Sequence, residues 1–187
     1  MSEFRPLGDG IALIGYRGTG KSTVGRIVAD RLAIPFLDTD SDIEYRFGTI
    51  RSIFEKRGEL TFRDYEELVI DELTKAGTGV IATGGGVILL ESNRRALRQF
   101  GRVFWLTANP DELASRLELD SKGVSERPSL TAAGTLGEIA SVLEARRPLY
   151  EETADVAIAT QGRTPAEVAD IILEILSNPW NNEVRSA

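Results

Sequence analysis

Short apolar segments alternate along the chain with longer stretches in which apolar residues recur three or four positions apart. This alternation is typical of βα units that build a parallel sheet. The apolar segments carry almost no charge, as expected for strands that are buried on both faces. They predict five strands, at Ile11–Ile14, Pro35–Leu37, Val80–Ala82, Val103–Leu106 and Val156–Ile158.

The stretches between these segments predict helices that cover both faces of the sheet. Asn109-Pro110 is a helix start with proline near the first turn, and Thr164-Pro165-Ala166-Glu167 is a capping box. A further helix is expected to end near Ala145, because Arg146-Arg147-Pro148 follows it. The other expected helices are Lys21–Leu32, Thr61–Lys75, Asp111–Leu119 and the one that runs from Thr164 through Ile175. These elements predict an α/β fold of three layers around a five-stranded parallel sheet.

Two polar segments fall outside the alternation, and both are candidates for functional loops. Residues 41–58 predict one or two short helices that are broken at Gly48. Residues 120–135 contain glycines and a proline but no apolar period, which predicts a lid. Surface insertions without a function have the same composition, so that alternative stays open for each segment. The core at about 11–176 predicts one domain, and the tail at 177–187 is expected to fray.

The residue types that are missing narrow the chemistry. The 187 residues include no histidine and no cysteine, which excludes imidazole bases, thiolate nucleophiles and Cys/His zinc sites. The 29 acidic side chains outnumber the 22 basic ones, which argues against nonspecific nucleic-acid binding. No apolar run approaches the roughly 20 residues of a membrane span, and the first residues lack the apolar core of a secretory signal. We therefore expect a cytoplasmic protein with no nucleic-acid or membrane partner.

The segment from Gly15 to Ser22, GYRGTGKS, matches the phosphate-binding loop G-x-x-x-x-G-K-[ST], after a predicted strand and at the start of a predicted helix. Its glycines let backbone N–H groups approach phosphate oxygens, and the helix N-terminus adds partial positive charge. Lys21 supplies a full charge for the phosphates, and the Ser22 hydroxyl is a hard oxygen ligand for Mg²⁺. The segment predicts binding of a nucleoside triphosphate.

The second predicted strand ends in Leu37-Asp38-Thr39-Asp40. Ligands of open α/β sheets bind at the carboxyl ends of the strands, so both carboxylates are candidates for the site. One would serve a metal ion, and the other would reach a substrate hydroxyl. A solvated turn or a helix N-cap is the alternative for these residue types.

Thr83-Gly84-Gly85-Gly86 closes the third predicted strand, where three glycines leave room for a ligand to approach the backbone. The alternative is a turn that needs unusual backbone angles. Arginines supply further cations: Arg63 precedes Glu66 and Glu67 by three and four positions, Arg127 lies in the predicted lid, and Arg146 precedes Pro148. Taken singly, each of these arginines is more typical of a surface than of a site.

The ordered set GYRGTGKST, LDTD, FRDYEE, TGGG, RP and RRPLYEETAD resembles shikimate kinases over residues 11–176. The resemblance implies a P-loop NTPase fold of the nucleoside-monophosphate-kinase type. It implies transfer of the γ-phosphoryl group of ATP to a hydroxyl group of shikimate, which gives shikimate 3-phosphate and ADP, with Mg²⁺ as the cofactor. Residues 41–62 would then be a substrate-binding insert and 120–135 a lid over the nucleotide, all within one kinase domain at 1–187, and we expect a monomer.

The resemblance also implies roles for individual residues. Ser22 and Asp38 are implied at Mg²⁺, and Asp40 is implied at the ring hydroxyls, where it would orient the acceptor and take its proton. The residues implied in catalysis are Lys21, Asp40 and Arg127. Those implied at ATP are Gly18, Thr19, Gly20, Lys21, Ser22, Thr23, Arg116, Arg127 and Arg163, and those implied at shikimate are Asp40, Arg63, Gly85, Gly86 and Arg146.

Two other functions compete with this interpretation. Another small-metabolite kinase of similar fold, such as a gluconate or nucleotide kinase, would share the phosphate loop. A nucleotide-dependent regulatory module without kinase activity would share it as well. Whether Arg63 and Arg146 converge on one anionic ligand separates a shikimate kinase from the other kinase, and turnover of ATP with candidate acceptors separates a kinase from the regulatory module.

Overall fold

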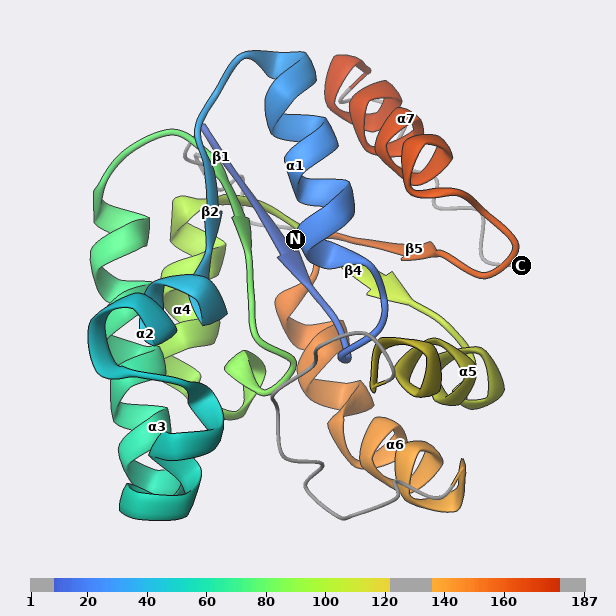
Figure 1. Cartoon of the computed structure of the whole chain (residues 1–187). Helices are drawn as coiled ribbons and strands as arrows, with labels where there is room; N and C mark the ends of the chain where they lie inside the picture. Colours follow the sequence, from blue (N-terminus) through green and yellow to red (C-terminus); the bar gives the residue numbers. More distant parts are fainter. Residues whose placement is uncertain (1–8, 122–135, 179–187) are drawn as a thin grey trace.

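The computed structural model describes residues 9–121 and 136–178 of the chain. A parallel five-stranded sheet forms its centre, in the order β2-β3-β1-β4-β5 (Figure 1). The predicted parallel sheet is confirmed, and each strand begins and ends within two residues of its predicted bounds. The strands are β1 (Gly10–Ile14), β2 (Phe36–Asp38), β3 (Val80–Ala82), β4 (Gly101–Thr107) and β5 (Val156–Ala159).

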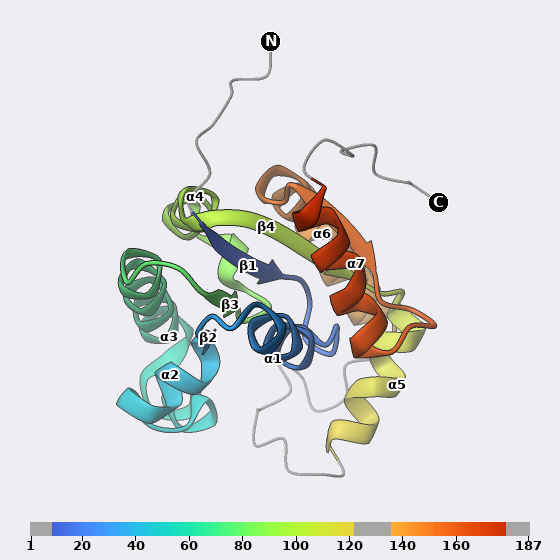
Figure 2. The same cartoon turned by 90° about the horizontal axis from the view of Figure 1, so that it is seen from above.

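Helices cover both faces of this sheet, as predicted. Figure 2 shows α1 and α7 together on one side of it, and α3, α4 and α6 pack on the other. The helices are α1 (Lys21–Leu32), α2 (Thr39–Phe47), α3 (Ile50–Lys75), α4 (Glu91–Phe100), α5 (Pro110–Ser121), α6 (Leu136–Thr153) and α7 (Pro165–Ser177), with a 3-10 turn at Val87–Leu89.

The side chains of β1 alternate between the two layers of the core. Ile11 and Leu13 pack against α1 and α7, whereas Ala12 and Ile14 pack against α3, α4 and α6. Successive side chains of a strand point to opposite faces, so an uninterrupted apolar strand needs a helical layer on each side. The uncharged strand segments of the sequence therefore reflect burial on two faces.

Two helices, α4 and α6, differ from the prediction. α4 was not predicted, because only Ala96, Leu97 and Phe100 are apolar in it, although Leu97 and Phe100 are buried. By contrast, the two short helices predicted within residues 41–58 are present, because α2 ends just before Gly48 and a first helical segment starts at Ile50. The non-helical angles of Gly58 (φ 83°, ψ 171°) mark a kink that separates this segment of α3 from the predicted helix that ends at Lys75.

The predicted end of a helix near Ala145 is wrong, because α6 continues through Pro148 to Thr153. Proline removes one backbone hydrogen bond and crowds the preceding turn. Tyr150, in the following turn, is fully buried and stacks on Trp105, with the ring centroids 5.2 Å apart. Burial of this aromatic side chain holds the second half of the helix in place.

The predicted lid and tail fall mostly outside the described residues. The first two residues of the lid segment, at 120 and 121, lie in the last turn of α5, and 122–135, including Arg127, are not described. α7 reaches Ser177, and 179–187 are not described. Within the described residues, no helix combines the length and the apolar character that a membrane span requires.

Candidate active site

Three loops meet at one edge of the sheet, where the parallel strands β1, β2 and β3 end. The loop after β1 contains Gly15, Gly18 and Gly20, whose φ angles are 141°, 82° and 86°. These are angles that other residues rarely adopt, which accounts for the glycines of the motif. Gly20 is the N-cap of α1, so the loop leads directly into the positive end of that helix.

Lys21 folds back over the loop that precedes it. Its Nζ donates hydrogen bonds of 2.8 Å to the carbonyl oxygens of Gly15 and Tyr16, and its side chain is buried. Thr19 Oγ1 also donates to the carbonyl of Tyr16, at 2.8 Å. The loop is therefore held in shape by its own polar groups, and the ammonium group of Lys21 is one of them.

Asp38 occupies the junction between β2 and α2. Its Oδ2 accepts a hydrogen bond of 2.6 Å from Ser22 Oγ, and its Oδ1 accepts one of 3.0 Å from the Ser41 amide. The residue is thus an N-cap of α2, as the alternative had it, and also a hydrogen-bond partner of Ser22, while its role at a metal ion stays a prediction. Asp40 lies in the first turn of α2, because the strand ends at Asp38, and its side chain is buried.

We call the cavity beside residues 17–24 the loop pocket. The sequence-predicted ATP residues in the described part of the chain all line it: Gly18, Thr19, Gly20, Lys21, Ser22, Thr23, Arg116 and Arg163. Arg116 Nη1 donates to the Gly18 carbonyl at 3.2 Å and to Thr160 Oγ1 at 3.1 Å. That side chain ties α5 to the phosphate loop and to the segment after β5.

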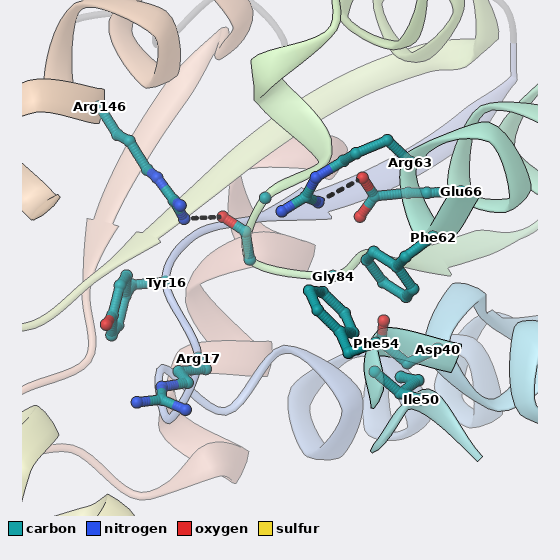
Figure 3. A pocket seen from close by; sticks show the side chains of 12 residues that line it. Tyr16, Arg17, Asp40, Ile50, Phe54, Phe62, Arg63, Glu66, Gly84 and Arg146 are labelled. Carbon is teal, nitrogen blue, oxygen red and sulfur yellow. Dashed lines mark hydrogen bonds and ion pairs between the residues drawn. The ribbon is translucent and has the colours of Figure 1, made fainter. Parts of the chain in front are cut away.

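A second cavity, which we call the arginine pocket, shares part of its lining with the loop pocket. Figure 3 shows the residues that line it. This pocket brings together the loop after β1, the α2–α3 insert, the glycines after β3 and one residue of α6. All five sequence-predicted shikimate residues line it, and Arg63 and Arg146 enter it from different helices. The lining is Tyr16, Arg17, Asp40, Ile50, Phe54, Phe62, Arg63, Glu66, Gly84, Gly85, Gly86 and Arg146.

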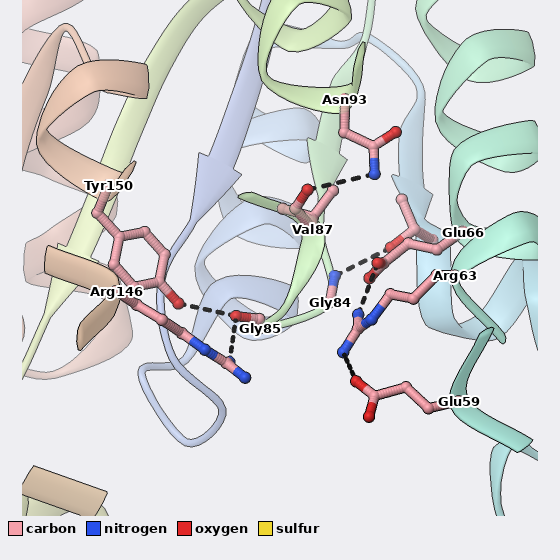
Figure 4. Close-up of polar contacts among 10 residues, drawn as sticks. Glu59, Arg63, Glu66, Gly84, Gly85, Val87, Asn93, Arg146 and Tyr150 are labelled. Atoms are coloured by element: carbon pink, nitrogen blue, oxygen red, sulfur yellow. Dashed lines mark hydrogen bonds and ion pairs between the residues drawn. The ribbon is translucent and has the colours of Figure 1, made fainter. Parts of the chain in front are cut away.

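Arg63 is held on both sides by carboxylates (Figure 4). Its Nη1 donates to Glu66 Oε2 at 2.7 Å, and its Nη2 donates to Glu59 Oε1 at 3.0 Å. The side chain of Glu66 is only 1% exposed, so this pair is not the exposed helix pair that the spacing also allowed. The sequence analysis did not name Glu66 as a site residue, although it noted that Glu66 follows Arg63 by three positions.

Burial raises the pKa of Glu66 to about 6, and Arg63 offsets only part of this effect. Burial alone would lower the pKa of Arg63, but Glu66 and Glu59 raise it above its ordinary value. Glu66 Oε1 is buried without a hydrogen-bond partner among the described residues. The arginine pocket is therefore lined by a largely buried ion pair between Arg63 and Glu66.

The three glycines after β3 are required by close approach rather than by unusual angles. A Cβ atom at Gly84 would lie 2.8 Å from Asp40 Oδ1 and 2.9 Å from Glu66 Oε1, and one at Gly86 would overlap the guanidinium of Arg63. Gly86 itself has an ordinary φ of −106°. The alternative of a turn with unusual backbone angles is therefore wrong, and the side-chain-free backbone makes room for the charged groups.

The carbonyl oxygen of Gly85 is held from α6 by two donors. Arg146 Nη1 donates to it at 3.2 Å and Tyr150 Oη at 2.8 Å (Figure 4). Burial raises the pKa of Tyr150, so its hydroxyl remains a donor at neutral pH. The sequence analysis did not single out Tyr150, although it follows Arg146 by one helical turn.

Known proteins match this chain over most of its length. A family model for shikimate kinases matches residues 17–177. The shikimate kinase of Rhodopirellula baltica is 41% identical over 163 residues, which cover 87% of each chain. That of Thermodesulfovibrio yellowstonii is 44% identical over 172 residues, or 90% of this chain and 96% of the relative.

Solved structures give the same result. The structure of Acinetobacter baumannii shikimate kinase in complex with shikimate matches with a TM-score of 0.84 and 39% identity, over 95% of this chain and 97% of that one. A gluconokinase from Sinorhizobium meliloti matches with a TM-score of 0.57 and 19% identity, over 94% and 95% of the two chains, which shows a shared fold alone. The chain belongs to the shikimate kinase family.

Proposed function

We propose that this protein transfers the γ-phosphoryl group of ATP to a hydroxyl group of shikimate. Membership of the shikimate kinase family supports this activity. The observation that carries the proposal for this chain is that Arg63 and Arg146 line one pocket beside the phosphate loop. A regulatory module that binds only a nucleotide gives no reason for two arginines from separate helices to face one small cavity. Gluconate carries a carboxylate as well, so the choice of shikimate over gluconate rests on the shikimate kinase family model that matches residues 17–177.

The arginine pocket suits a small ring that carries a carboxylate. A guanidinium group binds a planar carboxylate through two parallel hydrogen bonds, and Arg63 and Arg146 offer such groups from α3 and α6. Phe54 and Phe62 supply apolar surface for the ring, with centroids 4.8 Å apart. Asp40, at the mouth toward the loop pocket, is the acceptor for hydrogen bonds from ring hydroxyls.

In the reaction, the bond between the γ-phosphorus and its bridging oxygen breaks and a bond from the acceptor oxygen forms. The electron pair of the broken bond stays on ADP. The proton of the acceptor hydroxyl passes to the carboxylate of Asp40. Such transfers have a loose transition state, so positioning and charge neutralisation supply most of the catalysis, and Lys21 provides charge at the phosphates.

Ser22 Oγ and Asp38 Oδ2, which lie 2.6 Å apart, are hard oxygen atoms of the kind that Mg²⁺ prefers. These two residues would hold a magnesium ion at the phosphate loop. When bound, this ion neutralises charge on the phosphates of ATP. Arg127 lies outside the described residues, so its implied contact with the transferring phosphate stays a prediction, as do the monomeric state and the cytoplasmic location.

The test is a turnover assay with ATP, Mg²⁺ and a panel of acceptors: shikimate, gluconate and nucleoside monophosphates. Of these acceptors, only shikimate should support the formation of ADP. The mass of the product should exceed that of shikimate by one phosphoryl group. The methyl ester of shikimate should be a poor acceptor, because it cannot pair with the two arginines. Turnover of gluconate instead, or ATP binding without any turnover, would refute the proposal in favour of one of the two rival functions.

A further inference from the structure

Three residues line both the loop pocket and the arginine pocket: Arg17, Asp40 and Gly85. They therefore mark the boundary that a phosphoryl group crosses on its way from nucleotide to acceptor. Asp40 has a role there as acceptor of the hydroxyl proton, and Gly85 contributes backbone. Arg17 brings a positive charge to this boundary, and neither the phosphate-loop motif nor the mechanism above uses it.

Arg17 is placed at the boundary by the phosphate loop itself. It is the third residue of that loop, and its amide nitrogen lies 3.1 Å from where a Cβ atom of Gly85 would be. Figure 3 shows Arg17 and Asp40 on opposite sides of the lower part of the pocket. The backbone of Arg17 is therefore fixed within the phosphate loop, and its guanidinium extends from that loop to the boundary between the two pockets.

The hydrogen bonds of the three arginines differ. Arg63 is held at both Nη atoms by carboxylates, and Arg146 donates to the Gly85 carbonyl. The Nε of Arg17 is buried without a hydrogen-bond partner in the part of the chain that the structure describes, and its guanidinium lies 5.9 Å from the centre of the Tyr16 ring. A buried donor that lacks a partner costs free energy in the unliganded protein, which an anionic ligand would recover.

The position of Arg17 also indicates which anion it meets. Arg63 and Arg146 line the arginine pocket but not the loop pocket, so they suit the carboxylate at the far end of the acceptor. Arg17 lines both, so it suits the anion that is present on both sides of the boundary. That anion is the phosphoryl group, whose negative charge spreads over three non-bridging oxygens during transfer.

We propose that Arg17 is a further catalytic residue, which donates hydrogen bonds to the non-bridging oxygens of the phosphoryl group during and after its transfer. The proposal rests on the phosphoryl transfer proposed above. Arg17 forms no covalent bond and takes no proton in this step. Its contribution is charge and fixed donors, which are most effective where charge develops in a site that excludes water.

The test compares Arg17→Met with the wild-type protein in kinetics and in binding. We expect kcat to fall by at least about tenfold, because one preorganised donor at a developing charge contributes that much or more. The KM for shikimate should change less than about twofold. In calorimetry, the dissociation constant of shikimate 3-phosphate should rise at least about tenfold, while that of shikimate stays nearly unchanged.

Two further variants control for trivial effects. Arg95→Met removes an exposed arginine that pairs with Glu91 on α4, and it should leave kinetics and product binding at the wild-type level. Arg17→Lys keeps the positive charge but loses the planar guanidinium group with its paired donors. Its kcat should therefore lie between those of Arg17→Met and Arg95→Met. Thermal melting of each variant checks that it is folded.

Several outcomes would overturn the role of Arg17. A raised KM for shikimate with kcat retained would assign Arg17 to the acceptor carboxylate. Unchanged kinetics and product binding would make it a surface residue without a role in transfer. If the wild-type protein fails to phosphorylate shikimate but uses another acceptor, the proposed function fails alone, and the same comparison is made with that acceptor and its phosphorylated product.

Discussion

The loop pocket and the arginine pocket are built in different ways. The loop pocket takes much of its lining from the unbroken run 17–24, and its shape depends on glycine angles and on the start of one helix. The arginine pocket collects residues from segments far apart in the sequence, among them Tyr16, Phe54, Gly86 and Arg146. We therefore expect the contiguous backbone of the loop pocket to bind the phosphates of the nucleotide, and the assembled side chains of the arginine pocket to select the acceptor.

The charges of the two pockets differ as well. In the loop pocket, the ammonium of Lys21 contacts the carbonyls of its own loop. In the arginine pocket, Arg63 is bound by two carboxylates, of which Glu66 is almost completely buried. A buried ion pair depends on both partners, because loss of one leaves the other without compensation. The arginine pocket should therefore respond to pH and to small changes of shape, and the loop pocket to loss of a single charge.

The largest effect is expected for Lys21→Met, in the loop pocket. Turnover should fall by at least about 1,000-fold, because the lysine acts on charge that develops at the phosphates. ADP binding should weaken while shikimate binding stays unchanged, as measured by calorimetry. Lys75→Met, which removes an exposed lysine of α3, is the matched control. Equal losses for both ligands would contradict the separation of the two pockets.

The different construction of the two pockets also explains which site residues could be predicted from the sequence. The glycines, Lys21 and Ser22 form one local motif whose strand and helix context can be checked along the chain. Arg63 and Arg146 could be placed in the acceptor site only through the family resemblance, because nothing local shows that α3 and α6 face one cavity. Glu66 was passed over because a carboxylate three residues from an arginine is an ordinary surface pattern.

Elements that depend on tertiary packing were also predicted less well. The helix through Pro148 is held by burial of Tyr150 against Trp105, a contact between residues 45 positions apart. Local propensity ends a helix near proline, and packing overrides it here. α4 is mostly polar and shows its buried side only where Leu97 and Phe100 meet the sheet. Local rules cannot detect such tertiary contacts.

Asp40→Asn tests the boundary between the two pockets. We expect kcat to fall by about 100-fold, because an amide cannot take the proton of the acceptor hydroxyl. ADP binding, measured by calorimetry, should stay nearly unchanged. Asp71→Asn, on the outer side of α3, should leave turnover intact. A loss of ADP affinity as large as the loss of kcat would assign Asp40 to the metal site instead. The two pockets would then not be functionally separate at this residue.

Glu66→Gln tests the buried charges of the arginine pocket through pH. The pKa of Glu66 is about 6 in the folded protein against an ordinary value of 4.5, so the folded state holds its proton more tightly. Protonation of Glu66 therefore stabilises the folded state relative to the unfolded state. This stabilisation is fully present below about pH 4.5 and is lost as the pH rises through about 6. The free energy of unfolding of the wild type minus that of the variant should therefore fall by about 2 kcal/mol between pH 4 and pH 7.

Urea unfolding of both proteins at a series of pH values measures this difference, in which titrating groups that do not interact with Glu66 cancel. The loop pocket should not share the effect, so ADP binding should depend on pH in the same way in both proteins. A difference that is constant or that rises with pH would contradict the buried state of Glu66. It would also remove the electrostatic contrast between the two pockets.

The smallest effect is expected for Gly86→Ala, which changes the shape of the arginine pocket by one methyl group. The new Cβ atom would overlap the guanidinium of Arg63, which must move away from its present position. We expect kcat/KM for shikimate to fall by about tenfold, or about 1.4 kcal/mol, with the KM for ATP unchanged. Gly137→Ala in α6 is the matched control, because nothing lies within 4 Å of its added Cβ atom. If both variants keep wild-type kcat/KM, the guanidinium of Arg63 is free to move without loss, and the arginine pocket does not depend on its exact shape.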